Sequence, residues 1–174
     1  MPESTASEAV SNCFGCAPTN NIGLQLLFEQ AGDKCSARVR LGSDYESFPG
    51  IIHGGIVAAI MDETMAQTVY RSGRVAAFTI GLRIRYGRPM ETDTEYLASA
   101  EISGRDDCSV RVSGRLELPS GDLVAAGDGT FYLLTDPALR DSGPRSPEQL
   151  RQALAARRRP TAGALDNQPE GMVR

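Results

Sequence analysis

The segment HGGIVAAIMDE at residues 53–63 decides the fold of this chain. Apolar side chains dominate from there to Gly73, and no proline interrupts them, so the sequence predicts a helix over roughly Gly55–Ser72. Apolar residues occupy most of its circumference, which indicates a helix surrounded by other structure. Asp62 and Glu63 lie inside it, and a carboxylate among apolar neighbours is costly unless it has a use. The segment therefore predicts a central helix and a functional site.

The composition is that of an ordinary soluble protein with one core. The chain has 174 residues, 41% of them hydrophobic and 23% charged, and its formal net charge is −4. That charge gives no reason to expect nucleic acid as a partner. No apolar run reaches the roughly 20 residues of a membrane helix, and the first residues lack the basic and apolar order of a secretory signal. We expect a cytoplasmic protein that binds neither nucleic acid nor membrane.

Strand patterns lie on both sides of the helix. Leu24–Glu29 and Ser36–Leu41 alternate on either side of a glycine turn and predict a hairpin, whereas Gly42–Ile52 has no period and predicts a loop. Four further strand candidates follow the helix, and short turns between them predict antiparallel order. They are Val75–Tyr86, Glu95–Ser103, Ser109–Leu118 and Leu123–Leu134. This order predicts an α+β domain whose antiparallel sheet wraps around one long central helix.

The chain divides into three expected regions. Residues 1–12 are small and polar and predict a flexible N-terminus, and residues 13–134 form the folded domain. Residues 135–174 contain five of the ten prolines and seven arginines. We expect this tail to be disordered or loosely docked.

The four cysteines do not form a disulfide scaffold in a chain of this length. Cys35 and Cys108 fall in strand-like segments, where small core side chains are expected. Cys13 and Cys16 have a Cys-x-x-Cys spacing, but a zinc site needs four ligands, and neither a second pair nor a histidine lies near them in the sequence. The pair is predicted to be reduced and structural, and no metal site is predicted.

Three motifs resemble those of one family. FPGIIHGG at residues 48–55, the helix acid at Asp62 and the strand TIGLRIRYGRP at residues 79–89 resemble the hotdog-fold acyl-CoA thioesterases, in the PaaI-like and THEM4-like branch. CFGC at residues 13–16, with NNIGL at residues 20–24, is similar to a segment that many of these proteins carry. The resemblance covers about residues 13–134.

The resemblance implies a fold, a reaction and an assembly. The fold is a hotdog domain whose sheet continues into that of a second subunit. The reaction is hydrolysis of an acyl-CoA or acyl-carrier-protein thioester to a free acid and a thiol, with coenzyme A as part of the substrate and no other cofactor. The assembly is a homodimer or a dimer of dimers.

The start of the helix suits this chemistry. Backbone N–H groups in the first turn of a helix carry partial positive charge, and Gly54 and Gly55 let a thioester carbonyl approach them as an oxyanion hole. Gly54 and Asp62 are about 12 Å apart along a helix, too far for one thioester. The resemblance implies that the helix start of one subunit faces the carboxylate of the other.

The acting carboxylate is either Asp62 or Glu63, which point about 100° apart around the helix. The resemblance places the acid nine residues after His53, at Asp62, with Thr79 beside it. Glu63 is the alternative, or else it pairs with an arginine of the sheet. A carboxylate-activated water and direct attack to give an anhydride both fit these residues.

Four other residues are expected near the substrate. His53 is the only histidine, and it either caps the helix or orients the thioester. Ser47 stands where some relatives carry a water-orienting amide, and Phe48 follows it. Arg88 suits the phosphates of coenzyme A, because a guanidinium group binds phosphate through two hydrogen bonds.

Two other functions compete with hydrolysis. Hotdog dehydratases and hydratases need a histidine paired with an acid, and some carry that histidine directly before Phe-Pro-Gly, where this chain has Ser47. The third reading is a non-catalytic acyl-binding module. The absence of that histidine counts against a dehydratase, and the sequence leaves the binding module open.

Overall fold

The computed structural model describes residues 12–73 and 75–134. Both predicted extensions, residues 1–12 and 135–174, lie outside the described residues except for Asn12. Within the described part, no helix is long and apolar enough to cross a membrane.

The secondary structure follows the order strands, helix, strands. In the chain it runs β1 (Phe28–Ala31), β2 (Lys34–Val39), the 3-10 turn η1 (Ser43–Tyr45), β3 (Glu46–Phe48), β4 (Ile51–Ile52), α1 (Gly54–Gly73), β5 (Ala77–Tyr86), β6 (Tyr96–Arg105), β7 (Ser109–Glu117) and β8 (Leu123–Leu133).

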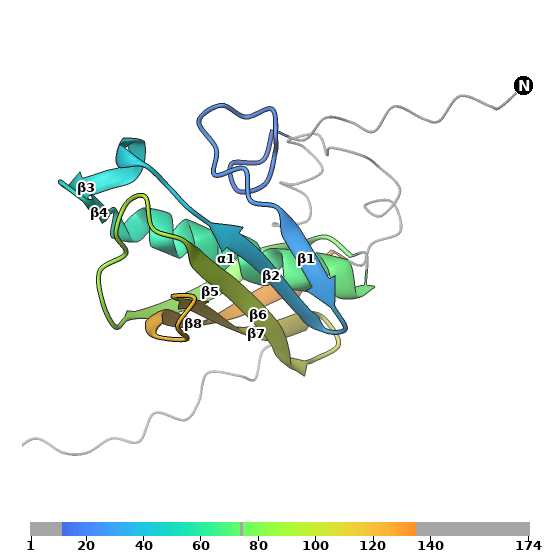
Figure 1. Cartoon of the computed structure of the whole chain (residues 1–174). Coiled ribbons are helices and arrows are strands. Elements are labelled where there is room, and N and C mark those ends of the chain that lie inside the picture. The colour runs from blue at the N-terminus through green and yellow to red at the C-terminus, as the bar shows by residue number, and fades with distance from the viewer. Residues whose placement is uncertain (1–11, 74, 135–174) are drawn as a thin grey trace, which may run out of the picture. The chain divides into compact units, whose positions relative to one another are not determined.

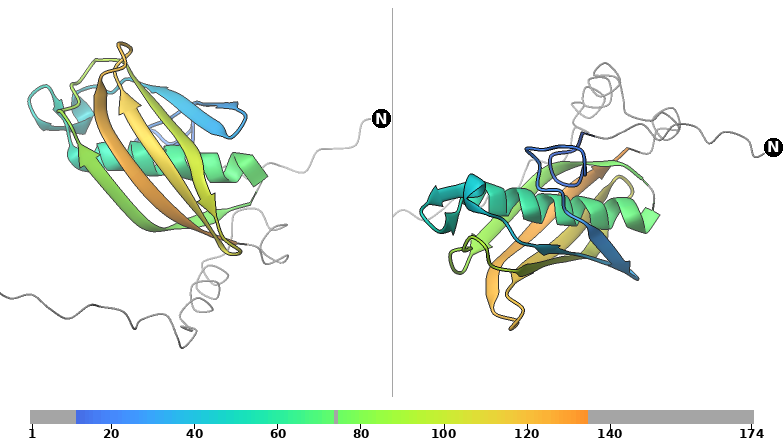
Figure 2. Two further views of the ribbon diagram at one scale, coloured as in Figure 1. Left: turned by 90° about the horizontal axis from the view of Figure 1, so that it is seen from below. Right: turned by 45° about the horizontal axis from the view of Figure 1, so that its top comes forward.

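Six strands form one antiparallel sheet in the order β1-β2-β6-β7-β8-β5, and β3 pairs with β4 in a separate hairpin. The long helix α1 crosses one face of this curved sheet (Figures 1 and 2). β5 lies at one edge and pairs with β8 as its single neighbour among the described strands. This arrangement is the hotdog fold that the sequence predicted.

The core lies between α1 and the sheet. α1 buries seven side chains along its length, and strands β7 and β8 contribute the fully buried Val110, Val112 and Phe131. The helix lies so close to the sheet that a Cβ at Gly129 would come within 3.1 Å of Met65 Sδ. Apolar contact on most sides explains why α1 lacks the polar face of a surface helix.

The structure confirms the central helix to within one residue at each end and β5 to β8 to within two residues. The predicted N-terminal hairpin is also present, but its first strand begins at Phe28 rather than Leu24. The Leu24 and Leu26 N–H groups donate instead to the carbonyls of Phe14 and Gly15, at 2.7 and 2.9 Å. The preceding loop therefore occupies the backbone groups that a longer strand would use.

Two local predictions are wrong. Residues 42–52 do not form a plain loop, because they contain η1 and the β3–β4 hairpin, which turns through Gly50 at φ +80°. Cys35 is buried as expected, but Cys108 is exposed. Cys108 lies in the turn that precedes β7, where the alternation of the strand has not yet begun.

Candidate active site

His53 caps the N-terminus of α1. Its Nδ1 accepts a hydrogen bond from the Gly55 N–H at 2.9 Å, and its carbonyl accepts those of Ile56 and Val57 at 2.8 and 3.2 Å. The His53 N–H donates to the carbonyl of Tyr45 at 2.8 Å. Side-chain acceptors at this position satisfy N–H groups that the helix itself cannot pair. The structure thus gives the single histidine a capping role.

The hydrogen bonds of His53 leave the N–H groups of the two following glycines in different states. The Gly55 N–H is taken by His53, whereas the Gly54 N–H has no hydrogen-bond partner within the described residues. Gly54 is exposed, and its carbonyl accepts a hydrogen bond from the Tyr86 hydroxyl at 3.0 Å. Of the two donors expected from the sequence, Gly54 is the one left to bind an incoming carbonyl oxygen.

A pocket of about 640 Å³ opens beside this helix start. Its size lies within the range of small-molecule sites. The structure brings together here four of the residues that were expected to contact substrate, Ser47, Phe48, Gly54 and Arg88, together with Tyr86. The remaining lining is mostly apolar and consists of Ile51, Ile52, Val57, Gly87, Pro89 and Met90.

Polar groups at the mouth of this pocket are only loosely held. Arg88 lies 3.7 Å from Asp122, and both side chains are about half exposed, at 48% and 58%. Such a surface ion pair is weak and leaves the guanidinium group available. Phe48 is 72% exposed, so a large apolar side chain also faces outward at this site.

Asp62 lies further along α1, on the side that faces β5. Thr79 Oγ1 donates a hydrogen bond to its Oδ1 at 2.8 Å. Burial raises the pKa of Asp62, the hydrogen bond from Thr79 lowers it, and the neighbouring charge of Glu63 raises it. The net direction is upward, so Asp62 is a weaker acid and a stronger base than a free aspartate.

Gly54 and Asp62 do not converge within one chain. Eight residues separate them, which is about 12 Å of helix. Asp62 instead lies beside β5, the edge strand. Its environment is open on that side, since Thr79 is exposed.

Glu63 points to another part of the molecule. Its Oε2 accepts a hydrogen bond from Cys13 Sγ at 3.5 Å, and its Oε1 accepts one from Gln67 Nε2 at 3.0 Å. The expected ion pair with an arginine of the sheet is wrong, because none of the ion pairs within the described residues includes Glu63. Glu63 is covered by the loop that carries Cys13 and Cys16.

The fold brings Glu63 next to the cysteine pair, a contact that the sequence did not predict. Gln67 Nε2 also lies 3.5 Å from Cys16 Sγ, and burial, with Glu63 and Cys13 close by, raises the pKa of Cys16. Sequence reasoning found no further ligand near the pair, because Glu63 follows it by about 50 residues and reaches it only through the fold.

Two other contributors were missed. Tyr86 was recognised as part of the strand motif but was given no role, although its hydroxyl contacts Gly54. Tyr45 holds the backbone of His53 through its carbonyl and donates from its hydroxyl to the carbonyl of Gly23 at 2.8 Å. Neither contact has a sequence signal, since each depends on distant segments meeting.

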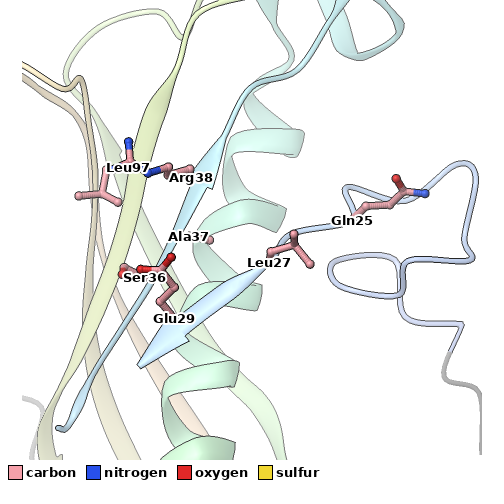
Figure 3. Close-up of a pocket in the computed structure, with 7 residues that line it drawn as sticks. All are labelled: Gln25, Leu27, Glu29, Ser36, Ala37, Arg38 and Leu97. Carbon is pink, nitrogen blue, oxygen red and sulfur yellow. The ribbon is translucent and has the colours of Figure 1, made fainter. Parts of the chain in front are cut away.

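A second pocket of about 520 Å³ lies at the other edge of the sheet (Figure 3). Gln25, Leu27, Glu29, Ser36, Ala37, Arg38 and Leu97 line it. None of the predicted site residues lies there. The pocket at the start of α1 is therefore the candidate active site.

The family model of the Thioesterase superfamily matches residues 49–125, which include His53, Gly54, Asp62 and Thr79. This chain belongs to the thioesterase superfamily. The match begins in the β3–β4 turn and ends within β8, so it spans the helix, strands β5 to β7 and the start of β8.

Individual relatives agree with this assignment. The acyl-coenzyme A thioesterase THEM5 of Homo sapiens is 31% identical over 88 residues, which are 51% of this chain and 35% of that protein. The chain thus matches about a third of the length of this curated relative. The solved structure of the Bacillus halodurans protein BH2602 with CoA is 32% identical, with a TM-score of 0.51, and the match covers 56% of this chain and 70% of that one.

A third relative supports the fold. A mutant form of the phenylacetic acid degradation protein PaaI from Thermus thermophilus has a TM-score of 0.58 at 23% identity, over 64% of this chain and 95% of that one. At this identity the likeness concerns the arrangement of helix and sheet. It supports the fold alone.

Proposed function

We propose that this protein hydrolyses an acyl-CoA thioester to a free acid and coenzyme A. The observation that carries the proposal is the position of Asp62, a partly buried carboxylate with a raised pKa that Thr79 Oγ1 holds at 2.8 Å. A carboxylate so placed on the central helix is an expected general base or nucleophile.

The Gly54 N–H supplies the second element of the chemistry. The positive end of α1 and this N–H stabilise the negative charge that develops on the thioester oxygen. Asp62 either removes a proton from the attacking water or attacks the carbonyl carbon itself to give an anhydride. In both routes the carbon–sulfur bond breaks, and the thiolate takes up a proton as it leaves.

The two routes differ in where the oxygen of water ends. One turnover in ¹⁸O-labelled water puts the label in the product acid if water attacks the thioester. If an anhydride forms and water attacks its aspartyl carbon, the label enters Asp62 instead. Label in the peptide that contains Asp62, found by mass spectrometry, therefore identifies the anhydride route, whereas label in the acid alone results from attack of water on the thioester or on the acyl carbon of an anhydride.

We further propose that two copies of the chain form each site. The distance of about 12 Å between Gly54 and Asp62 excludes one chain from holding a single thioester between them. β5 offers a ten-residue edge with one neighbouring strand among the described strands, and such an edge readily pairs with another chain. Antiparallel pairing of two β5 strands would continue the sheet and set each helix start opposite the partner's carboxylate.

Complementation tests this arrangement directly. Asp62→Asn and Gly54→Pro chains are each expected to be inactive alone. When they are co-expressed, half of the dimers are mixed and each mixed dimer has one intact site, so about a quarter of the wild-type activity returns. No recovery, in a mixture shown by mass spectrometry to contain mixed dimers, would contradict a shared site.

Coenzyme A is the proposed carrier. Arg88 lies at the pocket mouth in only a weak ion pair, and the B. halodurans relative was solved with CoA. An acyl carrier protein carries one phosphate on its pantetheine arm, whereas coenzyme A carries three. Arg88→Ala should therefore raise the KM for acyl-CoA more than that for the matching acyl-pantetheine.

The purified full chain should release free thiol from members of a panel of acyl-CoA thioesters. Ellman detection of the thiol gives the rate. Binding without turnover on every member would favour a non-catalytic acyl-binding module. Loss of water from a 3-hydroxyacyl thioester, without thiol release, would favour a dehydratase.

A further inference from the structure

Three metal-ligating side chains converge where the loop before β1 meets α1. They are Cys13 and Cys16, from the loop before β1, and Glu63, from α1. The two Sγ atoms and a carboxylate oxygen of Glu63 all lie within 4.8 Å of one another, and all three residues are partly buried. Cys13 Sγ and Glu63 Oε2 are 3.5 Å apart.

These separations are close to those in a zinc site. With Zn–S bonds of about 2.3 Å and Zn–O bonds of about 2.1 Å, tetrahedral coordination sets two sulfur ligands about 3.8 Å apart and sulfur and oxygen about 3.6 Å apart. The Cys-x-x-Cys spacing is also common in zinc sites, because it lets one short turn supply two ligands. Since the ligand atoms lie within 4.8 Å of one another, shifts of roughly 1 Å would let them surround an ion.

The loop is held in this position by its own backbone. The Ala17 N–H donates to the Cys13 carbonyl at 3.1 Å, which closes the turn around both cysteines. The Phe14 and Gly15 carbonyls accept hydrogen bonds from Leu24 and Leu26. A Cβ on Gly15 would lie 2.6 Å from Glu63 Oε2, so glycine permits the loop to rest directly on the carboxylate.

The surroundings of Glu63 also favour a bound cation. Among the described residues no lysine, arginine or histidine forms an ion pair with it. Gln67 contacts both Glu63 Oε1 and Cys16 Sγ, at 3.0 and 3.5 Å, which is the position of a group that orients ligands from outside the coordination sphere.

We propose that Cys13, Cys16 and Glu63 bind one Zn²⁺ ion, with a water or another exogenous ligand as the fourth donor. Two thiolates select a thiophilic divalent ion over Mg²⁺ or Ca²⁺. The ion fixes the N-terminal loop to the central helix. This site is independent of the proposed hydrolysis, since it uses none of the residues assigned to that reaction.

Cobalt is the probe for the first test. The full chain, reduced and freed of metal with a chelator, should take up one Co²⁺ per chain and develop a thiolate-to-cobalt charge-transfer band together with visible d–d bands of tetrahedral intensity. Zn²⁺ should then abolish the bands. The readout needs no substrate, so its failure and the failure of the proposed hydrolysis are distinguishable.

Variants locate the ion. Cys16→Ser should lose at least half of the charge-transfer intensity, and Glu63→Gln should weaken Co²⁺ binding at least tenfold, whereas Cys108→Ser, which alters an exposed cysteine outside the cluster, should change neither. A band of unchanged intensity in Cys16→Ser, or no cobalt uptake by the wild-type chain, would overturn the proposal.

A second measurement needs no substitution. Zn²⁺ should slow alkylation of Cys13 and Cys16 by iodoacetamide, as followed by peptide mass spectrometry, and should leave the rate at Cys108 unchanged. Zn²⁺ should also raise the melting temperature of the wild-type chain. Equal alkylation rates with and without Zn²⁺, or recovery of a Cys13–Cys16 disulfide from protein kept under reducing conditions, would contradict the site.

Discussion

Asp62 and Glu63 are consecutive residues of one helix, and the molecule surrounds them in different ways. Asp62 faces β5, where the Thr79 hydroxyl contacts it and where, among the described strands, the outer edge has no partner. Glu63 faces the loop at residues 13–16, where Cys13 contacts it and Gly15 rests against its side chain. Both carboxylates are half-buried, but the first lies against an edge strand and the second against a loop.

The difference follows from helix geometry. Successive residues project about 100° apart, so the side chains of two adjacent residues point into two different regions of the fold. Because the two acids are adjacent in the sequence, both were candidates for the same catalytic role. The structure teaches that only the first shares a side of α1 with the strand expected to meet a second subunit.

The largest expected effect tests which of the two carboxylates, Asp62 or Glu63, takes part in the reaction. Asp62→Asn should lower kcat by about 10²–10⁴-fold, the usual contribution of a general base. Glu63→Gln should lower it far less, because its contacts lie with the N-terminal loop. Steady-state thiol release with matched circular dichroism spectra measures both, and the reverse ranking would transfer the reaction to Glu63.

The next effect concerns the helix start. Gly54→Pro removes the N–H donor while leaving a residue that helices accept in their first position, and it should lower kcat by about 10²–10³-fold. Gly54→Ala is the control, since its Cβ would meet only the Tyr86 ring at 3.9 Å. Equal losses in the two variants would mean that space, rather than the donor, is what Gly54 provides.

A smaller effect is expected at His53. His53→Ala removes the acceptor for the Gly55 N–H and should lower stability by about 1 kcal/mol, which is a few degrees in melting temperature. His53→Asn offers an acceptor of the preferred kind and should retain most of that stability. If the alanine variant has the melting temperature of the wild type but turns over substrate more slowly, His53 acts on the substrate instead of on the helix.

The smallest effect should appear in the pH profile. The Thr79 hydrogen bond lowers the pKa of Asp62, so Thr79→Ala should raise that pKa further. In the proposed mechanism the ionised carboxylate is the active form, so the acidic limb of kcat/KM should move to higher pH. Thr79→Ser keeps the hydroxyl and should have the same profile as the wild type. An unmoved limb would separate Thr79 from the function of Asp62.

The same pKa direction has a consequence for stability. A carboxyl group whose folded pKa is raised stabilises the fold below its unfolded pKa of about 3.9 and loses that contribution as pH rises through the folded value. Asp62→Asn cannot ionise. The melting temperature of Asp62→Asn should therefore rise relative to that of the wild type as pH increases from about 4 to about 8. A difference in melting temperature that stays constant over this range would contradict the raised pKa.

Much of the fold was predictable from local pattern. The apolar run after His53 and the turns between β5, β6, β7 and β8 lie within the sequence window that periodicity uses, and the structure has these elements within two residues of the predicted bounds. The β3–β4 hairpin was missed because strands of three and two residues carry no measurable alternation.

The candidate site was predictable in composition but not in arrangement. The motif indicated Gly54, Asp62 and Thr79, and the structure adds that Asp62 and Thr79 are in contact. Two features were not predicted: the hydrogen bond from the Gly55 N–H to the His53 ring, and the contact of the loop that carries Cys13 with Glu63. Both depend on side-chain geometry across a turn or across the fold, which one sequence does not encode locally.

Tyr86 ends the edge strand, and its hydroxyl holds the first residue of the helix through the Gly54 carbonyl. In a protein whose copies join through β5, this bond links association of the subunits to the alignment of the amide proposed to receive the substrate. Thermodynamic reciprocity then requires that a ligand bound at that amide tighten the association by the same factor by which association tightens the ligand. Saturating product analogue should therefore slow the exchange of subunits between oligomers.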